Sequence, residues 1–338
     1  MRMRKIAVVV TNRASWGRVK SVCKAIDEHP KLMLQMIVAA SAVDLPIPYK
    51  PDAVIQCQID GDNLQAMTLT TGLFLCQVGG ALERLNPDFL YLHGDRHELS
   101  APAIAAAYQN VKIAHGEGGE TTSTIDQKVR YAISTLADIH FPVTELAKQK
   151  LIQMGCKPDN VHVVGSTALD TLKDIDLSNN HTEPYIVVLQ HPNTTDPEPI
   201  EPLIEALKRI PIHKIFINPN VDAGSKAMLR SIHKQDAEFI KNLPPEEYAR
   251  LIFNARCLVG NSSSFIKEAS YFGIPAILVG NRQQGREIGN NVLRVPNETE
   301  AIINGIFTQM NYDRKPDYRF GEGNAAQKIV KILAEVSL

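Results

Sequence analysis

The segment CLVGNSSSFIKEASYFGIPAILVG, residues 257–280, reads as a short apolar strand, a serine-rich turn, a helix and a second apolar strand. Asn and Ser are favoured at helix N-caps, because their side-chain oxygens accept hydrogen bonds from the unpaired N–H groups of the first turn. Gly273 followed by Pro275 is an ordinary helix stop. A helix that opens after a strand also favours anions at its N-terminus. The segment alone leaves both a plain cap and an anion site open.

Short apolar runs alternate with helical patterns along the whole chain, which is typical of parallel sheets with right-handed crossovers. Amphipathic stretches at residues 17–29, 101–109 and 125–137 lie between such runs. The runs predicted as buried strands are KIAVVV, LQMIVAA, FLYLHG, VKIAHG, IHFPV and VHVVG in the first half, and YIVVLQH, KIFINPN, CLVGN and AILVG in the second.

The chain of 338 residues is too long for one compact core and suits two domains. The polar run LSNNHTEP, residues 177–184, is the best linker candidate. We expect an α/β protein of two doubly wound, Rossmann-like domains, residues 1–175 and 180–315, that face a cleft, and a final helix at residues 325–338. In such sheets ligands bind beyond the carboxyl ends of the strands.

The composition excludes several classes of protein. Apolar residues make up 44% and charged residues 22%, which is globular composition, and the net charge of −1 gives no basic footprint for nucleic acid. No stretch approaches the ~20 apolar residues of a membrane span, and the run Ile6–Val10 is too short for a signal peptide. Five scattered cysteines without CxxC or CxH spacing suggest reduced thiols. We expect a cytoplasmic protein.

Polar side chains that could bind anions or transfer protons follow seven of the predicted strands. The segments are TNRASWGR, HGDRHE, HGEGGETTSTID, QHPNTTD, NPNVDAGS, GNSSS and NRQQGRE. Because the carboxyl ends of parallel strands meet at one edge of a sheet, this distribution favours an enzyme whose site lies in a cleft.

Three carboxylates, Asp95, Glu117 and Asp126, lie near the ends of successive elements of the first domain. Such a group suits acid–base catalysis, and it suits a metal less well because no HxxxH or DxD spacing accompanies it. Capping and loop turns are the structural alternative for each carboxylate.

The second domain offers hydrogen-bond donors and cations that fit a diphosphate. Glu268, one turn into the serine helix, could accept hydrogen bonds from ribose hydroxyls. Neither GxGxxG nor GxxxxGK[ST] occurs, so dinucleotide and P-loop sites are unsupported. The donor set is His191, Ser262, Ser263, Ser264, Arg282 and Arg286.

Taken in order across residues 11–328, these motifs, with FGEGNA near the end, resemble the UDP-N-acetylglucosamine 2-epimerase family. They are most similar to the hydrolysing branch that makes N-acetylmannosamine for sialic acid. The resemblance implies a glycosyltransferase-B type fold and a small-molecule nucleotide-sugar substrate. It also implies a homo-oligomer, dimer or tetramer, with no metal or redox cofactor and no nucleic-acid or membrane partner.

The resemblance also implies roles for individual residues. The reaction would be elimination of UDP across C1–C2 to a glycal, followed by addition of water with inversion at C2. Because the C2 proton is not acidic, the leaving diphosphate must be neutralised. The implied catalytic residues are Asp95, Glu117, Asp126 and His191, and the implied substrate contacts are Arg13, Arg96, Ser262, Ser263, Ser264, Glu268, Arg282 and Arg286.

The chain departs from the family pattern at several positions. Phe265 stands where the family has Gly, and its helical spacing with Ala269 and Phe272 predicts that it points into the core. The segment of residues 39–51 is shorter than the family's sugar-proximal loop. The other departures are Gly116 for a branched apolar residue, Tyr131 for His, Ser15 for an acidic residue and Trp16 for Tyr.

Four alternatives stay open. Two keep the chemistry: a diacetamido-trideoxy sugar nucleotide as the substrate, or a non-hydrolysing epimerase that re-adds UDP. A third is a glycosyltransferase of the same fold, which gives no reason for three carboxylates. The fourth is an inactive UDP-sugar binding module, against which the retention of Asp95, Glu117, Asp126 and His191 argues.

Overall fold

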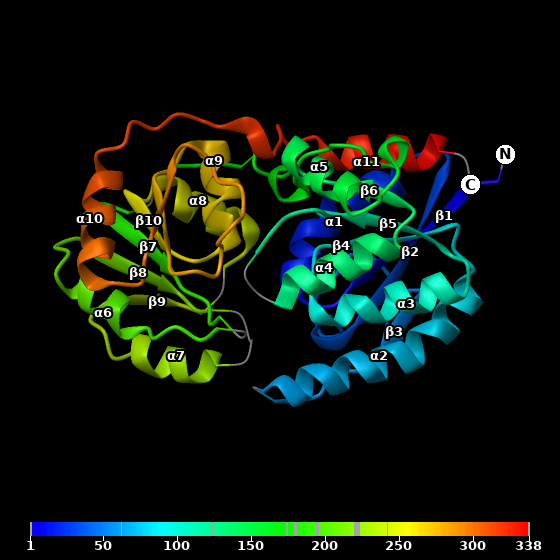
Figure 1. The fold of residues 1–338 in the computed structure, drawn as a ribbon, viewed down its shortest axis with the longest axis horizontal. Helices are drawn as coiled ribbons and strands as arrows, with labels where there is room; N and C mark the ends of the chain where they lie inside the picture. The colour runs from blue at the N-terminus through cyan, green and yellow to red at the C-terminus, as the bar shows by residue number, and fades with distance from the viewer. Residues whose placement is uncertain are drawn as a thin grey trace. The chain divides into compact units, whose positions relative to one another are not determined.

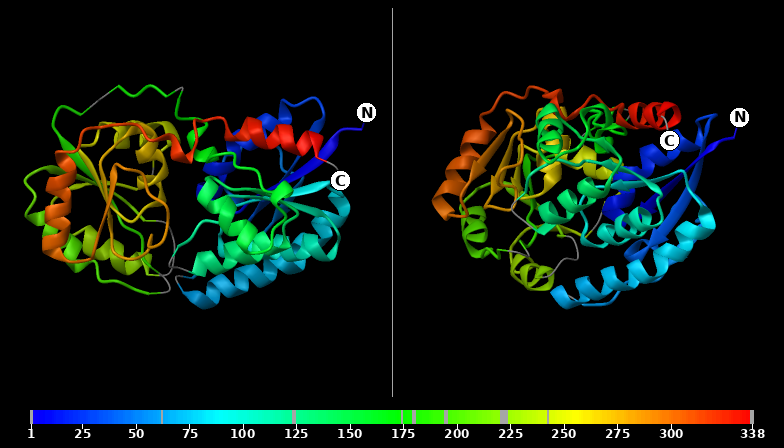
Figure 2. Two further views of the ribbon diagram at one scale, coloured as in Figure 1. Left: turned by 45° about the horizontal axis from the view of Figure 1, so that its top comes forward. Right: turned by 45° about the vertical axis from the view of Figure 1, so that its right-hand side comes forward.

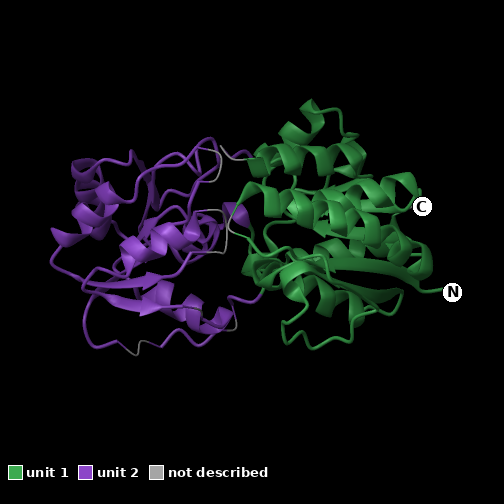
Figure 3. Cartoon of the chain, turned by 90° about the horizontal axis from the view of Figure 1, so that it is seen from below, with its two compact units in different colours: residues 1–120, 125–170, 321–338 green, residues 121–124, 171–320 purple. Residues whose placement is uncertain are grey.

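The protein forms two compact units (Figure 3). Unit 1 comprises residues 1–120, 125–170 and 321–338, and unit 2 comprises residues 121–124 and 171–320. The computed structural model describes residues 2–61, 63–122, 125–173, 175–178, 181–193, 196–219, 224–241 and 243–336.

Each unit is built on a six-stranded parallel sheet (Figure 1). The strand orders are β3-β2-β1-β4-β5-β6 and β12-β11-β10-β7-β8-β9, so both units have the same topology. In each unit the first three strands extend the sheet toward one edge, and the last three extend it toward the other edge, starting beside the first strand. This confirms the prediction of two doubly wound α/β folds. Unit 1 contains β1 (Arg4–Val10), β2 (Leu32–Ala39), β3 (Ala53–Ile55), β4 (Phe89–His93), β5 (Lys112–Gly116) and β6 (Ile139–Phe141); unit 2 contains β7 (Tyr185–Leu189), β8 (His213–Ile217), β9 (Glu238–Ile240), β10 (Cys257–Gly260), β11 (Ala276–Val279) and β12 (Val292–Val295).

Helices pack on both faces of each sheet (Figure 2). This explains why the strands are continuous apolar runs rather than alternating ones. The helices of unit 1 are α1 (Arg13–Asp27), α2 (Leu64–Leu85), α3 (Ser100–Tyr108), α4 (Ile125–Leu136), α5 (Glu145–Gln153) and α11 (Ala325–Glu335); those of unit 2 are α6 (Glu201–Lys208), α7 (Ser225–Ile232), α8 (Pro245–Asn254), α9 (Lys267–Phe272) and α10 (Thr299–Met310).

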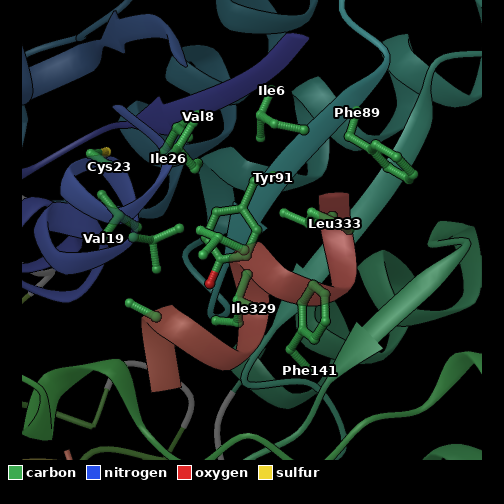
Figure 4. Close-up of a cluster of buried hydrophobic side chains, with 14 of the residues drawn as sticks. Ile6, Val8, Val19, Cys23, Ile26, Phe89, Tyr91, Phe141, Ile329 and Leu333 are labelled. Carbon is green, nitrogen blue, oxygen red and sulfur yellow. The ribbon is translucent and has the colours of Figure 1, made fainter. Parts of the chain in front are cut away.

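The unit 1 sheet separates two hydrophobic cores by the alternation of its side chains. Phe89 and Tyr91 of β4 face α1 and α11, whereas Leu90 and Leu92 face α2, α3 and α4. Figure 4 shows the first core, in which the ring of Tyr91 lies among aliphatic side chains of β1, α1 and α11. Period-2 alternation therefore fixes which β4 side chains meet which helices.

The helix α11 belongs to unit 1 although unit 2 precedes it in the sequence. Its first turn is capped by Asp170, whose carboxylate oxygens accept the N–H groups of Ala325 and Ala326 at 2.8 and 2.9 Å. A carboxylate at this position also interacts favourably with the positive end of the helix dipole. Ile329 and Leu333 of α11 are fully buried in the first core.

One predicted strand, VHVVG, is wrong. Val161 forms a single parallel bridge with His140, and the following residues form no strand. His162 and Val164 still donate their N–H groups to the carbonyls of His140 and Pro142. Because Pro142 has no N–H to donate in return, the ladder stops at this point.

Several predicted segments lie partly outside the described residues. They are the linker at residues 177–184, the end of the final helix at residues 325–338, and the motifs HGEGGETTSTID, QHPNTTD and NPNVDAGS. Across the described ranges, no helix is both long enough and apolar enough to cross a membrane.

Candidate functional site

Unit 1 gathers the predicted carboxylates at the carboxyl edge of its sheet. His93 of β4 and Gly116 of β5 are partners in register, so the loops that carry Asp95 and Glu117 begin side by side. Asp126 lies in the first turn of α4. In doubly wound sheets ligands bind at this edge, where the strand order reverses; here that is between β1 and β4.

Glu117 is the most constrained of the three carboxylates. It is 3% exposed and has φ of 61°, a left-handed conformation that is unfavourable for a residue with a side chain. Arg18 Nη1 donates to its Oε2 at 2.7 Å, and the Ser166 hydroxyl donates to its Oε1 at 2.8 Å. His93 Nε2 lies 3.6 Å from Oε1. The surrounding structure therefore holds this carboxylate in one orientation.

Asp95 forms an ion pair with Arg130, a residue of α4 that is only 2% exposed. Arg130 also donates from Nη1 to the carbonyl of Glu120 at 2.8 Å. Burial alone lowers the pKa of Arg130, but Asp95, Glu120 and Asp126 more than offset it and raise the pKa. Arg130 is thus a permanent buried cation that holds the loop of Asp95 and lies within electrostatic range of Asp126.

Glu98 is a buried carboxylate that the sequence analysis missed. It is 2% exposed and lies near three nitrogen atoms: Arg96 Nε at 3.4 Å, His97 Nδ1 at 3.0 Å and Asn12 Nδ2 at 3.3 Å. Burial alone would raise the pKa of Glu98, but Arg96 and His97 bring it well below the usual range. The charged Glu98 therefore links the loop after β1 to the loop after β4, and it engages the predicted substrate contact Arg96.

The loop after β1 explains one departure from the family pattern. Asn12 caps α1 by accepting the N–H of Ser15, and the Ser15 hydroxyl accepts the N–H of Asn12 in return. Ser15 thus completes a capping box, a role that an acidic residue also serves. Arg13, the first residue of α1, is exposed and makes no hydrogen bond or ion pair with the described residues. Arg18, further along the same helix, is the arginine that donates to Glu117.

His115 holds the loop after β4, which carries Asp95, in place at the carboxyl edge of the unit 1 sheet. It is fully buried, and burial lowers its pKa to about 3, so the ring is neutral. Nε2 lies 2.8 Å from the carbonyl of Gly94, which can only accept, so Nε2 carries the proton and Nδ1 accepts from the Ser134 hydroxyl at 3.0 Å. This pair of bonds anchors Gly94, the residue before Asp95.

In unit 2 one residue, Asn261, joins two of the predicted contacts, His191 and Arg282. Its Oδ1 accepts the N–H of His191 at 2.7 Å, and its Nδ2 donates to the carbonyl of His191 at 2.9 Å. Its own carbonyl accepts from Arg282 Nη1 at 3.2 Å and from Gln283 Nε2 at 2.9 Å. The ends of β7, β10 and β11 are thereby held together. The predicted contacts in GNSSS were its serines, so the role of Asn261 was missed.

The serine turn is a short 3₁₀ helix, Ser263–Phe265, followed by the six residues of α9. Ser262 is its N-cap, which confirms the predicted cap. The N–H groups of Ser264, Phe265 and Ile266 are used within the turn itself. The hydroxyls of Ser262 and Ser264 lie 2.9 Å apart, and Ser264 also contacts the Tyr248 hydroxyl. The groups that the turn can offer to a ligand are therefore its serine hydroxyls, because these three backbone N–H groups are already bonded.

Phe265 in the 3₁₀ turn and Ala269 in α9 are fully buried, whereas Phe272, the third residue of the predicted face, is half-buried. The burial of Phe265 confirms that it is a core residue of unit 2. Glu268 lies in the first turn of α9, partly exposed, and contributes to raising the pKa of Tyr248, for which burial is the main cause.

The loop after β11 carries the two predicted arginines and is braced on the loop after β7. Arg286 is buried and donates from Nη1 to Gln283 Oε1 at 3.1 Å. Asn281 receives a hydrogen bond from Asn193 Nδ2 at 2.8 Å, and its N–H donates to Glu198 Oε2 at 3.0 Å. These bonds fix the backbone from which Arg282 and Arg286 project.

Each unit thus has one chemical character at the carboxyl edge of its sheet. Unit 1 presents held carboxylates with arginines beside them, which suits proton transfer. Unit 2 presents hydroxyls, guanidinium groups and a histidine around Asn261, which suits an anionic ligand. The described parts of the chain bring Asp95, Glu117 and Asp126 together in unit 1, and His191, Ser262 and Arg282 together in unit 2.

Comparison with known proteins gives a family. The chain matches the family described as UDP-N-acetylglucosamine 2-epimerase over residues 24–334. It is 30% identical over 330 residues, covering 90% of this chain and 87% of the relative, to UDP-N-acetylglucosamine 2-epimerase of Neisseria meningitidis serogroup B. It is also 30% identical over 365 residues, covering 99% and 97%, to UDP-N,N'-diacetylbacillosamine 2-epimerase (hydrolyzing) of Legionella pneumophila.

The solved structures agree on the fold. The crystal structure of the Neisseria meningitidis UDP-GlcNAc 2-epimerase bound to UDP-GlcNAc superposes with a TM-score of 0.81 at 20% identity, covering 98% of this chain and all of that chain. The fold, the order of the motifs and the match along nearly the whole chain lead to one conclusion. The chain belongs to the UDP-N-acetylglucosamine 2-epimerase family.

Proposed function

We propose that this protein is a hydrolysing UDP-N-acetylglucosamine 2-epimerase that releases UDP and N-acetylmannosamine. The observation that carries the proposal is Glu117, a buried carboxylate held in a strained conformation by Arg18 and Ser166. Strain of this kind persists only where the surroundings over-determine it, and it clusters at functional sites. Together with Asp95 and Asp126, Glu117 forms a set of three carboxylates, for which transfer of a sugar to an acceptor gives no reason.

The reaction divides into steps that the two residue sets can serve. Arg282 and the serine hydroxyls of unit 2 hydrogen-bond the diphosphate and stabilise its charge as the C1–O bond breaks. Arg286, Arg13 and Arg96 are further proposed contacts, and His191 is a further proposed catalytic residue. Glu268 accepts hydrogen bonds from the ribose. In unit 1 a carboxylate removes the C2 proton, and a carboxylate pair then adds water across the glycal.

Glu117 is the best candidate for the base. Its two oxygens accept hydrogen bonds from Arg18 and Ser166, and donors to a carboxylate favour its ionised form. Asp95 is paired with Arg130, so it too is held as a carboxylate. Asp126 is partly exposed, which suits exchange of protons with water.

A second substrate is favoured by one observation. The relative from Legionella pneumophila is named as a hydrolysing epimerase of a diacetylated bacillosamine nucleotide, and the match spans 97% of its length. A diacetamido-trideoxy sugar nucleotide is therefore the competing substrate, with the same elimination and hydration. The name of that relative also supports the hydrolysing outcome.

The test is incubation with UDP-N-acetylglucosamine in heavy water, without added metal, followed by proton NMR. We expect free UDP and N-acetylmannosamine with deuterium at C2. Accumulation of UDP-N-acetylmannosamine would instead place the protein in the non-hydrolysing branch. Turnover of the diacetamido nucleotide alone would identify the second substrate, and no turnover of either would contradict the proposal.

We also propose that the protein self-associates and works in the cytoplasm. The helix α2 supports self-association, because Leu69 and Leu73 are exposed one turn apart and no charged residue precedes Glu83 in the helix. Exposed apolar patches of this kind are typical of interaction surfaces. All five cysteines are free thiols, which suits a reducing compartment.

A further inference from the structure

Tyr91 and His93 lie two positions apart on β4, so their side chains leave the same face of the sheet. The ring of Tyr91 is part of the first hydrophobic core of unit 1 (Figure 4). Its hydroxyl lies at the edge of that core, 2.9 Å from Nδ1 of His93. Tyr91 thus packs in the core and also makes a polar contact with His93, which in turn lies beside Glu117.

The environment fixes the direction of this hydrogen bond. Burial, and then the charge of Glu117, raise the pKa of Tyr91 well above its usual value, so the phenol stays protonated. If His93 carried its proton on Nδ1, the lone pair of Nε2 would face the carboxylate of Glu117 at 3.6 Å. With the proton on Nε2, the phenol donates to Nδ1 and the N–H faces the carboxylate, which is the attractive arrangement.

Nε2 of His93 is left without a hydrogen bond. The residue is 5% exposed, and none of the described residues provides a partner for this atom. A buried polar atom without a partner is costly, and it is uncommon outside functional sites. Glu117 Oε1 is slightly too far away, so a small movement of either group, or a substrate group, completes the bond.

Gly116 provides the space for the tyrosine. It lies opposite His93 in register, on the same face of the sheet. A Cβ at this position would lie 2.5 Å from the Tyr91 hydroxyl and 2.7 Å from Nδ1 of His93, closer than real Cβ atoms come to their neighbours. The glycine that departs from the family pattern is therefore the residue that allows Tyr91 and His93 to meet.

We propose that Tyr91 is a positioning residue that holds His93 in the tautomer protonated at Nε2, so that a buried donor faces Glu117. In this tautomer the Nε2–H group of the imidazole faces the carboxylate of Glu117 and stabilises its ionised form. The consequence for turnover rests on the proposed epimerase function, whereas the tautomer itself does not.

The first experiment is NMR of the full chain labelled with ¹⁵N at histidine. The His93 signals are assigned by their loss in His93→Gln. We expect a protonated Nε2 and a hydrogen-bonded, unprotonated Nδ1 in the wild type, and loss of the hydrogen-bond shift at Nδ1 in Tyr91→Phe. The matched control is Tyr185→Phe, which removes a buried hydroxyl that donates to the Leu251 carbonyl in unit 2. A wild-type His93 protonated at Nδ1 would overturn the proposal.

The second experiment measures turnover. Tyr91→Phe should lower kcat about 10- to 100-fold with little change in KM, the usual scale for a group that orients a functional histidine, while Tyr185→Phe should not. Gly116→Ala should lower kcat as well, and its effect should be smaller in a Tyr91→Phe background because the clash with the hydroxyl is gone. Unchanged kcat in Tyr91→Phe would refute the positioning role. Wild-type protein that turns over no nucleotide sugar would refute the proposed function, and the NMR result would still decide the tautomer.

Discussion

Arg18 and Glu117, 99 positions apart in the sequence, form an ion pair in which Nη1 of the arginine lies 2.7 Å from Oε2 of the carboxylate. The side chain of Glu117 is 4% exposed and that of Arg18 is 30% exposed. The partly exposed Arg18 thus lies between the buried carboxylate and the solvent. Its helix, α1, begins at the capping box of Asn12.

Arg18→Ala should therefore affect both stability and turnover. Removal of one partner leaves the other as an uncompensated buried charge, and we expect a loss of about 1–3 kcal/mol in the free energy of unfolding. We also expect a lower kcat, because Glu117 loses a hydrogen bond that holds its carboxylate in one orientation. Lys24→Ala, at an exposed position of the same helix, is the matched control. Denaturant unfolding and steady-state kinetics provide the measurements, and a stable Arg18→Ala variant with normal kcat would contradict the assigned role.

The carboxylates and the unit 2 contacts should have separable effects. Asp95→Asn, Glu117→Gln and Asp126→Asn should each lower kcat by about 10²-fold or more, the scale for a positioned acid or base, and each should retain UDP affinity. Arg282→Ala should weaken UDP binding, because its guanidinium is fixed by the carbonyl of Asn261 beside the serine turn.

Isothermal titration with UDP and steady-state kinetics on the same preparations test this division. Carboxylate variants that lose UDP affinity but retain kcat would show that the roles of the two sets are assigned wrongly.

Phe265→Gly should destabilise the protein without improving UDP binding. The ring is fully buried, so its removal creates a cavity that costs about 3–5 kcal/mol, and glycine adds a backbone penalty. Phe265→Leu, which retains apolar volume, is the control and should cost much less. Thermal unfolding and UDP titration measure the two effects. A stable Phe265→Gly variant with sharply tighter UDP binding would contradict the buried position.

The stability of the protein should fall as the pH falls below about 6.5. Burial lowers the pKa of His115 from 6.5 to about 3 and that of His140 to about 4. Between these values the unfolded chain binds protons that the folded chain does not, so each histidine lowers the free energy of unfolding by up to about 1.4 kcal/mol per pH unit. The contribution is complete above the unfolded pKa and is lost as the pH falls toward the folded pKa.

Denaturant titrations at pH 6.5, 6.0 and 5.0 measure this slope, in a range where carboxylates contribute little. His115→Gln should reduce the slope, and His213→Gln, at an exposed histidine, is the control. A slope that does not change in His115→Gln would show that this ring is not neutral in the folded protein.

The exposed face of α2 should mediate self-association. Leu69 and Leu73 are 47% and 40% exposed and lie one turn apart. We expect Leu69→Glu with Leu73→Glu to shift the protein to a smaller species in sedimentation velocity, because charge opposes the burial of this face. Leu146→Glu, at an equally exposed position on α5, is the control. A wild-type protein that sediments as a monomer at high concentration would refute the proposal.

The fold was predictable because both sheets are buried on both faces. Each central strand is then a continuous apolar run, as in KIAVVV and YIVVLQH, and such runs are visible without structural information. The strands β3, β9 and β12 were missed, since they are short and include exposed positions. VHVVG has the composition of a strand, but its neighbour in the structure contains Pro142, which has no N–H to donate to a ladder. The sequence of VHVVG itself does not reveal which strand lies beside it.

The site was predictable in its residue types and less so in its partners. Acidic and serine residues after strands indicated Glu117 and Ser262, because strand ends converge in a parallel sheet. Arg18, Ser166 and Asn261 act through contacts 99, 49 and 70 positions away in the sequence, and no local pattern encodes such distances.

The helix α11 has a consequence for the order in which the molecule forms during synthesis. Unit 2 lies almost wholly in one continuous stretch, residues 171–320, whereas unit 1 needs residues 321–338 as well. During synthesis, residues 171–320 are therefore made before Ile329 and Leu333 of the first core, and before the N–H groups of Ala325 and Ala326 that Asp170 accepts. The N-terminal part of unit 1 therefore keeps an apolar surface uncovered until α11 is available, and an uncovered surface of this kind is prone to aggregation.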